Sequence, residues 1–138
     1  MVIRNMIGER INNSLEAGKI LRAILDSEDE MDRDKEHFWV IGLTAKNAVK
    51  FIELVSLGTL SNSLIHPRET FRRSIAKGTA SIIVGHNHPS GDPTPSRDDI
   101  EITMRLKNAG EIVGIALLDH VIIGEEDKFT SLREKGYL

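Results

Sequence analysis

The sequence predicts a single domain of the α+β or mixed α/β class, in which helices cover a β-sheet. Its 138 residues match the commonest domain size and leave no room for a second sizeable core. Segments with helical spacing of apolar side chains alternate with short apolar runs of strand length. Their order is helix, two or three strands, helix, strand, helix and two strands, which favours packed layers of sheet and helix.

The first predicted element is a helix over residues 11–25. Its apolar side chains recur at about helical spacing, and Asn13 and Ser14 are available as caps. The following residues 26–36 are strongly acidic and polar. We expect them to form a solvated connector, with the main core beginning just after it.

A β-hairpin and a short helix are predicted next. Residues 38–43 and 49–55 are rich in β-branched and aromatic side chains and flank a segment of turn-like composition. The second strand of this hairpin can continue to Leu60. Pro67 suits the first position of a helix and Gly78 supplies a stop, so we expect a short helix between them.

The last part of the chain combines a buried strand with a helix and two further strands. Residues 80–86 form an apolar run that fits a central buried strand. After a loop rich in proline and glycine, Ser96 opens a helix that we expect to end at Gly110. Residues 112–118 and 120–123 are then predicted as strands. The loop therefore joins the end of a buried strand to the start of a helix.

Composition restricts the chemistry of the chain. It contains no cysteine, so any metal must be held by histidine, aspartate or glutamate. With 18 basic and 21 acidic residues the net charge is -3, and we do not expect direct nucleic-acid binding without an added DNA-binding module. No apolar run approaches the ~18 residues needed to cross a bilayer, and the start lacks a secretory pattern. A cytoplasmic location without membrane contact is the expectation.

Two histidines and an aspartate form a candidate metal site. His86 and His88 are two positions apart, and in extended backbone such side chains point the same way, so both imidazoles can converge on one ion. The proline-rich loop that follows can return the next helix to the strand end, and Asp99 lies in the first turn of that helix. Two imidazoles and one carboxylate give a tetrahedral zinc three ligands and leave a position for water. This pattern indicates a catalytic site.

Each of these residues also has a simpler structural interpretation. Histidines at a strand end can be ordinary hydrogen-bonded residues. Ser96 and Asp99 are spaced as an N-cap and third helical residue, so capping is the simpler role for that pair alone. We expect His37 and His66 to be surface or turn residues, and His120 to orient structure near the site without touching metal.

The motifs resemble those of a known family. The His-x-His-Pro sequence that begins at His86 is followed by Ser-x-x-Asp that ends at Asp99. Together they resemble the motif of the JAB/MPN (JAMM) metalloproteases, and segments 66–69 and 86–96 look like its RadC branch. The resemblance implies a cytidine-deaminase-like β-sheet flanked by helices, with zinc held by His86, His88 and Asp99.

The resemblance also divides the chain. It runs from about residue 36 to the end, so we expect an N-terminal helix and acidic connector over residues 1–35 and a RadC-like JAB/MPN domain over residues 36–138. Full-length RadC-like proteins usually carry an N-terminal helix-hairpin-helix region. The first 35 residues are too short and too acidic to match that region, which indicates a stand-alone or an excised domain.

In the family, a glutamate upstream of the motif activates the metal-bound water and the motif serine stabilises the developing oxyanion. Here Ser96 takes the serine role, and Glu36, just before the first core strand, is our choice for the glutamate. Glu69 is the second candidate, although its place at a helix start also favours plain dipole and capping interactions. Glu53 is a weaker candidate that we expect on an exposed strand.

The leading functional hypothesis is a zinc-dependent hydrolase that cleaves peptide or isopeptide bonds in an unspecified peptide or protein. The alternative is a metal-binding interaction module of the DNA-repair-associated, RadC-like type without peptidase activity. A nucleic-acid-binding domain is a third hypothesis, which rests on the association with this family and on a basic cluster in one helix. A solvated helix face is the simpler interpretation of that cluster, whose members are Arg68, Arg72, Arg73 and Lys77.

Overall fold

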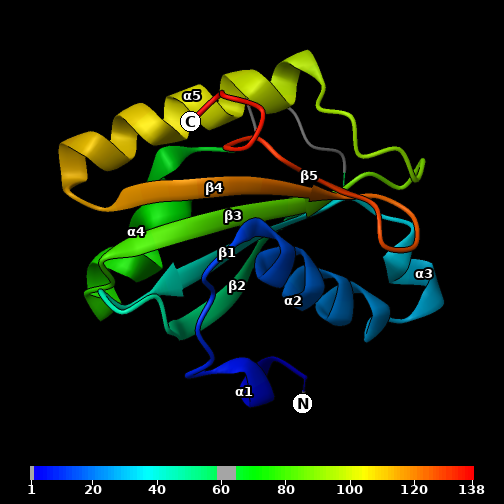
Figure 1. Cartoon of the computed structure of the whole chain (residues 1–138), viewed down its shortest axis with the longest axis horizontal. Helices are drawn as coiled ribbons and strands as arrows, with labels where there is room; N and C mark the ends of the chain where they lie inside the picture. The colour runs from blue at the N-terminus through cyan, green and yellow to red at the C-terminus, as the bar shows by residue number, and fades with distance from the viewer. Residues whose placement is uncertain (1, 59–64) are drawn as a thin grey trace.

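A five-stranded mixed sheet with helices on both faces forms the molecule (Figure 1). The computed structural model describes residues 2–58 and 65–138. The helices are α1 (Val2–Met6), α2 (Ser14–Asp26), α3 (Glu30–Arg33), α4 (Pro67–Lys77) and α5 (Arg97–Val113), and the strands are β1 (His37–Leu43), β2 (Val49–Leu57), β3 (Ser81–Asn87), β4 (Ala116–Ile123) and β5 (Phe129–Ser131). The predicted α+β class is therefore confirmed.

The order of the strands across the sheet is β2-β1-β3-β4-β5. Strands β3 and β4 are parallel, whereas the other neighbouring pairs are antiparallel. A parallel pair needs a crossover connection, and α5 supplies it across one face of the sheet (Figure 1). The crossover runs back along the sheet, so the first turn of α5 lies near the carboxyl end of β3. This placement brings the two halves of the metal motif together.

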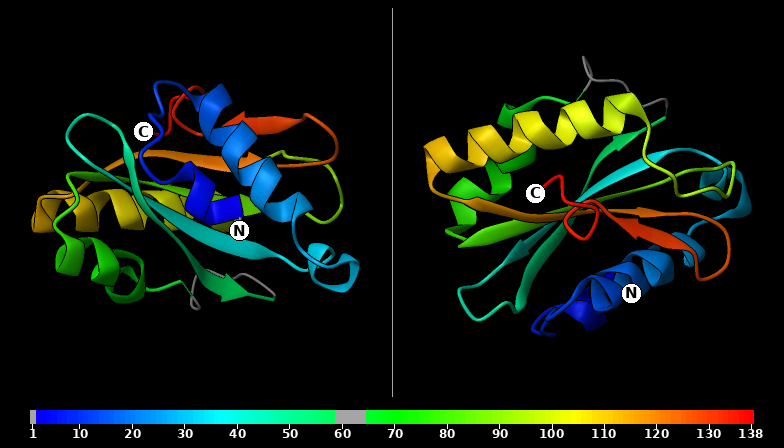
Figure 2. Two further views of the ribbon diagram at one scale, coloured as in Figure 1. Left: turned by 90° about the horizontal axis from the view of Figure 1, so that it is seen from below. Right: turned by 45° about the horizontal axis from the view of Figure 1, so that its top comes forward.

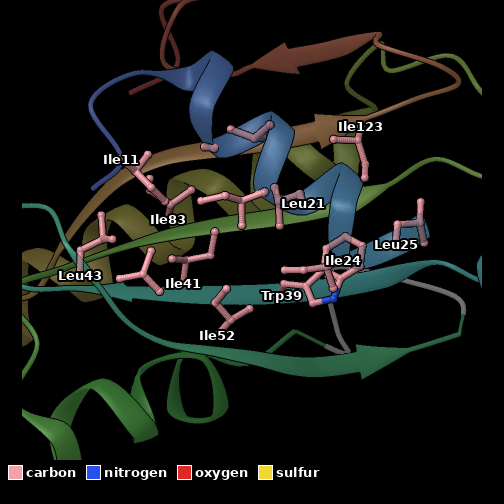
Figure 3. Packing of buried hydrophobic residues seen from close by; sticks show 14 residues of the cluster. Ile11, Leu21, Ile24, Leu25, Trp39, Ile41, Leu43, Ile52, Ile83 and Ile123 are labelled. Atoms are coloured by element: carbon pink, nitrogen blue, oxygen red, sulfur yellow. The ribbon is translucent and has the colours of Figure 1, made fainter. Parts of the chain in front are cut away.

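One hydrophobic core lies between α2 and the sheet (Figure 3). In that view Leu21 and Ile24 of α2 point towards the aliphatic and aromatic side chains of β1 and β3. A Cβ atom at Gly85 would overlap the side chain of Leu21, so glycine at this position of β3 allows α2 to approach the strand closely. Since α2 precedes the acidic segment, residues from both sides of that segment share one core. Its buried members are Ile11, Ala17, Ile20, Leu21, Ile24, Leu25, Trp39, Ile41, Leu43, Val49, Ile52, Ile83, Val121 and Ile123.

The expectation that the chain has no room for a second sizeable core was wrong, because a second core lies on the opposite face of the same sheet, beneath α4 and α5, which lie side by side in both views of Figure 2. Along β3, Ile82 and Val84 belong to this second core and Ile83 to the first. The period of two in a strand therefore places His86 on the α4–α5 face. The buried members of this core are Phe38, Val40, Phe51, Ile65, Phe71, Ile82, Val84, Ile102, Leu106, Ile115 and Leu117.

Most predicted elements are present, with their capping residues. Asn13 caps α2 through its side chain, and Pro67 and Gly78 begin and end α4 as predicted. Three short elements were not predicted, namely α1, β5, and α3, which lies inside the expected solvated connector. Such short segments carry too few residues to show a periodic pattern. None of the helices in the described part of the chain is long and apolar enough to cross a membrane.

The end of α5 differs from the prediction. The helix continues past Gly110 to Val113, and Gly114, with a φ of 77°, is its cap. Gly110 instead allows a close approach, because a Cβ atom there would overlap the backbone oxygen of Ile115. The strand predicted to begin at Ile112 was therefore wrong at its start, and β4 is one strand. The predicted continuation of β2 beyond residue 58 lies outside the described residues.

Candidate metal centre

The three predicted metal ligands, His86, His88 and Asp99, come together at the carboxyl end of β3 and are called the metal group below. His86 is buried near the carboxyl end of β3, and His88 directly follows the strand. Asp99 is buried in the first turn of α5. One ligand atom from each side chain lies within 4.8 Å of the other two. The spacing of the histidines and the returning loop thus produce the convergence expected from the sequence.

The geometry of this group was compared with that of a tetrahedral metal. The Nε2 atom of His86 lies 3.0 Å from Nε2 of His88 and 3.0 Å from Oδ1 of Asp99, and Nε2 of His88 lies 3.0 Å from Oδ2 of Asp99. Metal–ligand bonds of ~2.0–2.1 Å place neighbouring ligand atoms of a tetrahedral site about 3.3 Å apart. Only a small expansion therefore separates this arrangement from a metal-binding geometry.

The hydrogen bonding of His88 shows why a cation fits here. Its Nδ1 atom lies 2.8 Å from the backbone oxygen of Asp92, which can only accept, so Nδ1 carries a proton. In the neutral ring, Nε2 then directs its lone pair towards the Asp99 carboxylate, 3.0 Å away. Acceptor atoms so close together repel each other unless a cation lies between them. His86, His88 and Asp99 can therefore hold a metal ion.

The pKa shifts of the metal-free group reflect the same demand for positive charge. The hydrogen bond to Asp99 is the main reason why the pKa of His88 is raised above its ordinary value. Burial alone would raise the pKa of the Asp99 carboxyl, but its polar contacts with the rings of His86 and His88 outweigh burial and hold this pKa well below its usual range. Asp99 is thus ionised, as a carboxylate ligand must be.

Asp99 is at the same time part of a capping box. Its backbone N–H donates to Oγ of Ser96 at 3.1 Å, and the backbone N–H of Ser96 donates to Oδ2 of Asp99 at 2.8 Å. The capping interpretation of this pair is therefore correct, and it coexists with the position of Asp99 in the metal group. The cap fixes the direction of the carboxylate. Because Oγ of Ser96 accepts from Asp99, its hydroxyl proton can be donated elsewhere.

The metal group borders a hollow of about 410 Å³. Glu36, half-buried in the segment before β1, is part of its wall, and the charge of its carboxylate contributes to the raised pKa of His88. Hollows of similar size beside α2 have no cluster of metal-ligating atoms among the described residues. The lining residues are Glu36, His88, Pro89, Ser90, Ser96, Asp98, Asp99 and Ile102.

The other two candidate glutamates lie elsewhere. A carboxylate oxygen of Glu69 is 3.5 Å from Arg72 within α4, and one of Glu53 is 3.8 Å from Arg73. Neither glutamate is among the residues that line the hollow. The structure therefore brings Glu36 and Ser96 to one hollow with the metal group and leaves Glu53 and Glu69 outside it.

Asn87, between the two histidines, holds the segment that carries Glu36. Its Oδ1 accepts the backbone N–H of His37 at 2.6 Å, and its Nδ2 donates to the backbone oxygen of Lys35 at 3.0 Å. These two bonds flank Glu36 on either side. Sequence reasoning missed Asn87, and its place between two candidate ligands is the signal that could have found it.

The remaining histidines have distinct positions. The expectation that His37 is a surface residue was wrong, because β1 begins at this residue in the middle of the sheet and its ring is buried and stacked on Trp39. His66 is a helix cap, as a turn residue would be, and accepts from the backbone N–H of Arg68. His120 is fully buried, and its Nε2 lies 2.7 Å from Nδ1 of His86, so its expected place behind the site is confirmed.

A mixed sheet flanked by helices, with two histidines at the end of a central strand and an aspartate in the first turn of the following helix, is consistent with a JAB-type domain. The family model described as RadC-like JAB domain matches residues 11–137. The chain therefore belongs to the RadC-like JAB domain family, which confirms the resemblance of its motifs. The matched region includes α2 as well as the residues of the metal group.

Bacterial relatives support this assignment. The chain is 56% identical over 111 residues to a UPF0758 protein of Desulforamulus reducens, an alignment that covers 80% of this chain and 48% of that protein. It is 49% identical over 127 residues to a UPF0758 protein of Clostridium botulinum, with 92% of this chain and 53% of that protein covered. The chain thus spans about half the length of the curated relatives it matches.

Proposed function

We propose that this chain is a zinc-dependent hydrolase that cleaves peptide or isopeptide bonds. The observation that carries the proposal is the hollow that Glu36 and Ser96 line together with His88 and Asp99 of the metal group. A closed structural zinc site has four protein ligands, whereas the described residues bring three metal-ligating side chains together. Ligands, base and hydroxyl donor are then present in one place.

Zinc suits this set of side chains. Neutral imidazoles and a carboxylate are common zinc ligands, and the chain offers no thiolate that would select a softer metal. When bound, zinc would lower the pKa of a water in its open position towards ~7 and polarise the attacked carbonyl.

The roles of the protein side chains follow from their positions. Glu36 would accept the proton of the attacking water on its carboxylate and pass it to the leaving amine. Ser96 would donate its hydroxyl proton to the oxygen that becomes negative as the carbonyl is attacked. Asn87 would keep Glu36 in place through the backbone on both sides of it. The proton balance closes, because the water proton leaves with the amine.

Metal analysis combined with one pair of variants tests this proposal. We expect close to one zinc per chain, lost in Asp99→Ala. Glu36→Gln should retain zinc and lower hydrolysis by about 10²–10⁴-fold, because the base is removed and the ligands are kept. Glu69→Gln is the matched control and should change neither quantity. Cleavage is followed by mass spectrometry on two pools, peptides from a digested proteome and peptides joined through lysine side chains.

Two outcomes would contradict the proposal. The absence of bound transition metal from carefully purified protein would contradict the proposed metal binding. Cleavage at wild-type rates by the zinc-loaded Glu36→Gln variant would contradict the role of Glu36 as the base.

A metal-binding interaction module without peptidase activity is the second candidate function. The observation that favours it is the place of the ligands, since a metal held by His86, His88 and Asp99 would join the end of β3 to the start of α5 and stabilise the fold. Zinc binding that raises the melting temperature, without cleavage of either pool, would favour this function. The basic side chains of α4 offer less support for a nucleic-acid interface, since Arg72 and Arg73 pair with Glu69 and Glu53.

A further inference from the structure

A chain of buried polar side chains lies behind the metal group, between β4 and α5. His86 is 1% exposed, and His120 and Thr103 are fully buried. In the parallel pairing of β3 with β4, His120 lies opposite Val84, which places its ring on the same face of the sheet as His86. Thr103 is one turn after Asp99 on α5 and faces the same space. Each of these three side chains forms a hydrogen bond with another residue of the protein.

The distances between the polar atoms of neighbouring members of this chain of side chains are short, and they define the order of its members. Oγ1 of Thr103 lies 2.7 Å from the backbone oxygen of Asp99 and 2.5 Å from Nδ1 of His120. At the other end of the second imidazole, Nε2 of His120 lies 2.7 Å from Nδ1 of His86. The chain thus begins at a backbone carbonyl and ends at a metal-ligating ring.

The carbonyl oxygen at the start fixes the direction of every bond. It can only accept, so the single hydroxyl proton of Thr103 is donated to Asp99 and Oγ1 must accept from His120. Nδ1 of His120 therefore carries the proton. Neither partner of this buried ring is an anion that would stabilise a second proton, so Nε2 is left as an acceptor.

The last bond in the chain determines the tautomer of His86. Because Nε2 of His120 accepts, Nδ1 of His86 must donate, and Nε2 of His86 then offers its lone pair to the space shared with His88 and Asp99. We propose that His120 and Thr103 are positioning residues of the metal centre, which fix His86 in the tautomer that binds metal through Nε2.

This inference rests on the proposed metal site and extends it to two residues that do not touch the ion. His88 reaches the same tautomer by a direct bond to the backbone oxygen of Asp92. His86 has two side chains between it and a carbonyl, and that carbonyl belongs to Asp99, the third ligand. The first turn of α5 thus supplies both a ligand and the fixed end of the chain that orients another ligand.

Variants of Thr103 test the inference, with a closely matched control in α4. Thr103→Val removes the hydroxyl with little change of shape, and Thr103→Ser keeps it. Thr70 is equally buried and makes the same kind of bond, from its hydroxyl to the backbone oxygen of His66, but lies in another helix. Thr70→Val therefore controls for the loss of a buried hydroxyl. Zinc affinity is measured by competition with a chelator, and melting temperature is measured on the same samples.

We expect both valine variants to lower the melting temperature, and only Thr103→Val to weaken zinc binding, by about 10–100-fold. Thr103→Ser should restore affinity to near the wild-type value. Equal affinity of Thr103→Val and wild type would overturn the inference. Equal loss of affinity in Thr70→Val would also overturn it, because a general loss of stability would then explain the effect.

Ring-nitrogen NMR of the zinc-loaded protein reads the tautomers directly. We expect protonated Nδ1 and proton-free Nε2 in both His86 and His120 in the wild type, with a change in the His120 signals in Thr103→Val. A proton on Nε2 of His120 would overturn the inference. Failure of the wild type to bind zinc would instead contradict the proposed function, and the His120 signals of the metal-free protein would still test the direction of the bonds.

Discussion

The two faces of the sheet use the same strands for different purposes. On the face covered by α2, the strands contribute a continuous aliphatic and aromatic core (Figure 3). On the face covered by α4 and α5, a similar apolar core gives way at the carboxyl end of β3 to buried polar side chains. Alternation along β3 sends Ile83 to the first face and His86 to the second.

This difference shows how a small domain carries a polar site at modest cost to its stability. Buried imidazoles and hydroxyls destabilise a fold unless they are hydrogen-bonded, and here His86, His120 and Thr103 are joined in one chain. The α2 face stabilises the sheet mainly through apolar burial. We therefore expect the stability of the fold and the proposed metal binding to be separable, so that variants can address one without the other.

The largest effect on stability is expected from the α2 face. Leu21→Ala removes a fully buried side chain that packs on Gly85 and should lower the free energy of unfolding by about 3 kcal/mol, because it creates a cavity. Zinc bound per folded chain should not change. Urea denaturation and metal analysis measure the two quantities. A parallel loss of zinc at equal folded fraction would show that the two faces are coupled.

A smaller effect on stability is expected at Asn87, which lies between two of the proposed metal ligands and holds the segment before β1. Asn87→Ala leaves the buried backbone N–H of His37 without its partner and removes one of the two hydrogen bonds to the carbonyl of Lys35, which should cost about 2 kcal/mol of unfolding free energy. Zinc affinity should stay near the wild-type value, since the ligands remain, while hydrolysis should fall as Glu36 is released. Asn108→Ala, at an exposed position of α5, is the control and should change neither property. Unchanged stability of Asn87→Ala would refute the holding role of this amide.

The smallest expected effect is a dependence of stability on pH in the metal-free protein, which comes from histidines on the α4–α5 face. The pKa of His88 is raised above 6.5 in the folded state. Below pH 6.5 the folded and unfolded states therefore both hold this proton, and the stabilisation that protonated His88 provides is complete. As the pH rises from 6.5 through the folded pKa, the unfolded state releases its proton first and stability falls.

His120 has the opposite sign. Burial lowers its pKa below 6.5, so its contribution is complete above pH 6.5 and is lost as the pH falls, because only the unfolded state then takes up the proton. Urea unfolding with a chelator between pH 5 and about 9 should therefore show a maximum near neutrality. His88→Gln should remove the alkaline decline alone. An alkaline decline that persists in this variant would assign it to another group.

The sequence by itself determined the α+β class, the principal helices and strands, and the three side chains of the metal group. These features are local, because a period of two along β3 and the first turn of α5 fix where His86, His88 and Asp99 point. Residue type then restricts the chemistry, since the chain has no cysteine and few ways to hold a metal.

The tertiary structure decided the partners of that site. Asn87 meets His37 across 50 residues of chain and His120 meets His86 across 34, and no spacing in the sequence announces such pairs. Packing also decided the role of Gly110, since a glycine that ends a helix and one that permits a close approach look alike in a sequence. The physical reason is common to all three, because these roles depend on contacts between elements, and only the folded sheet brings the elements together.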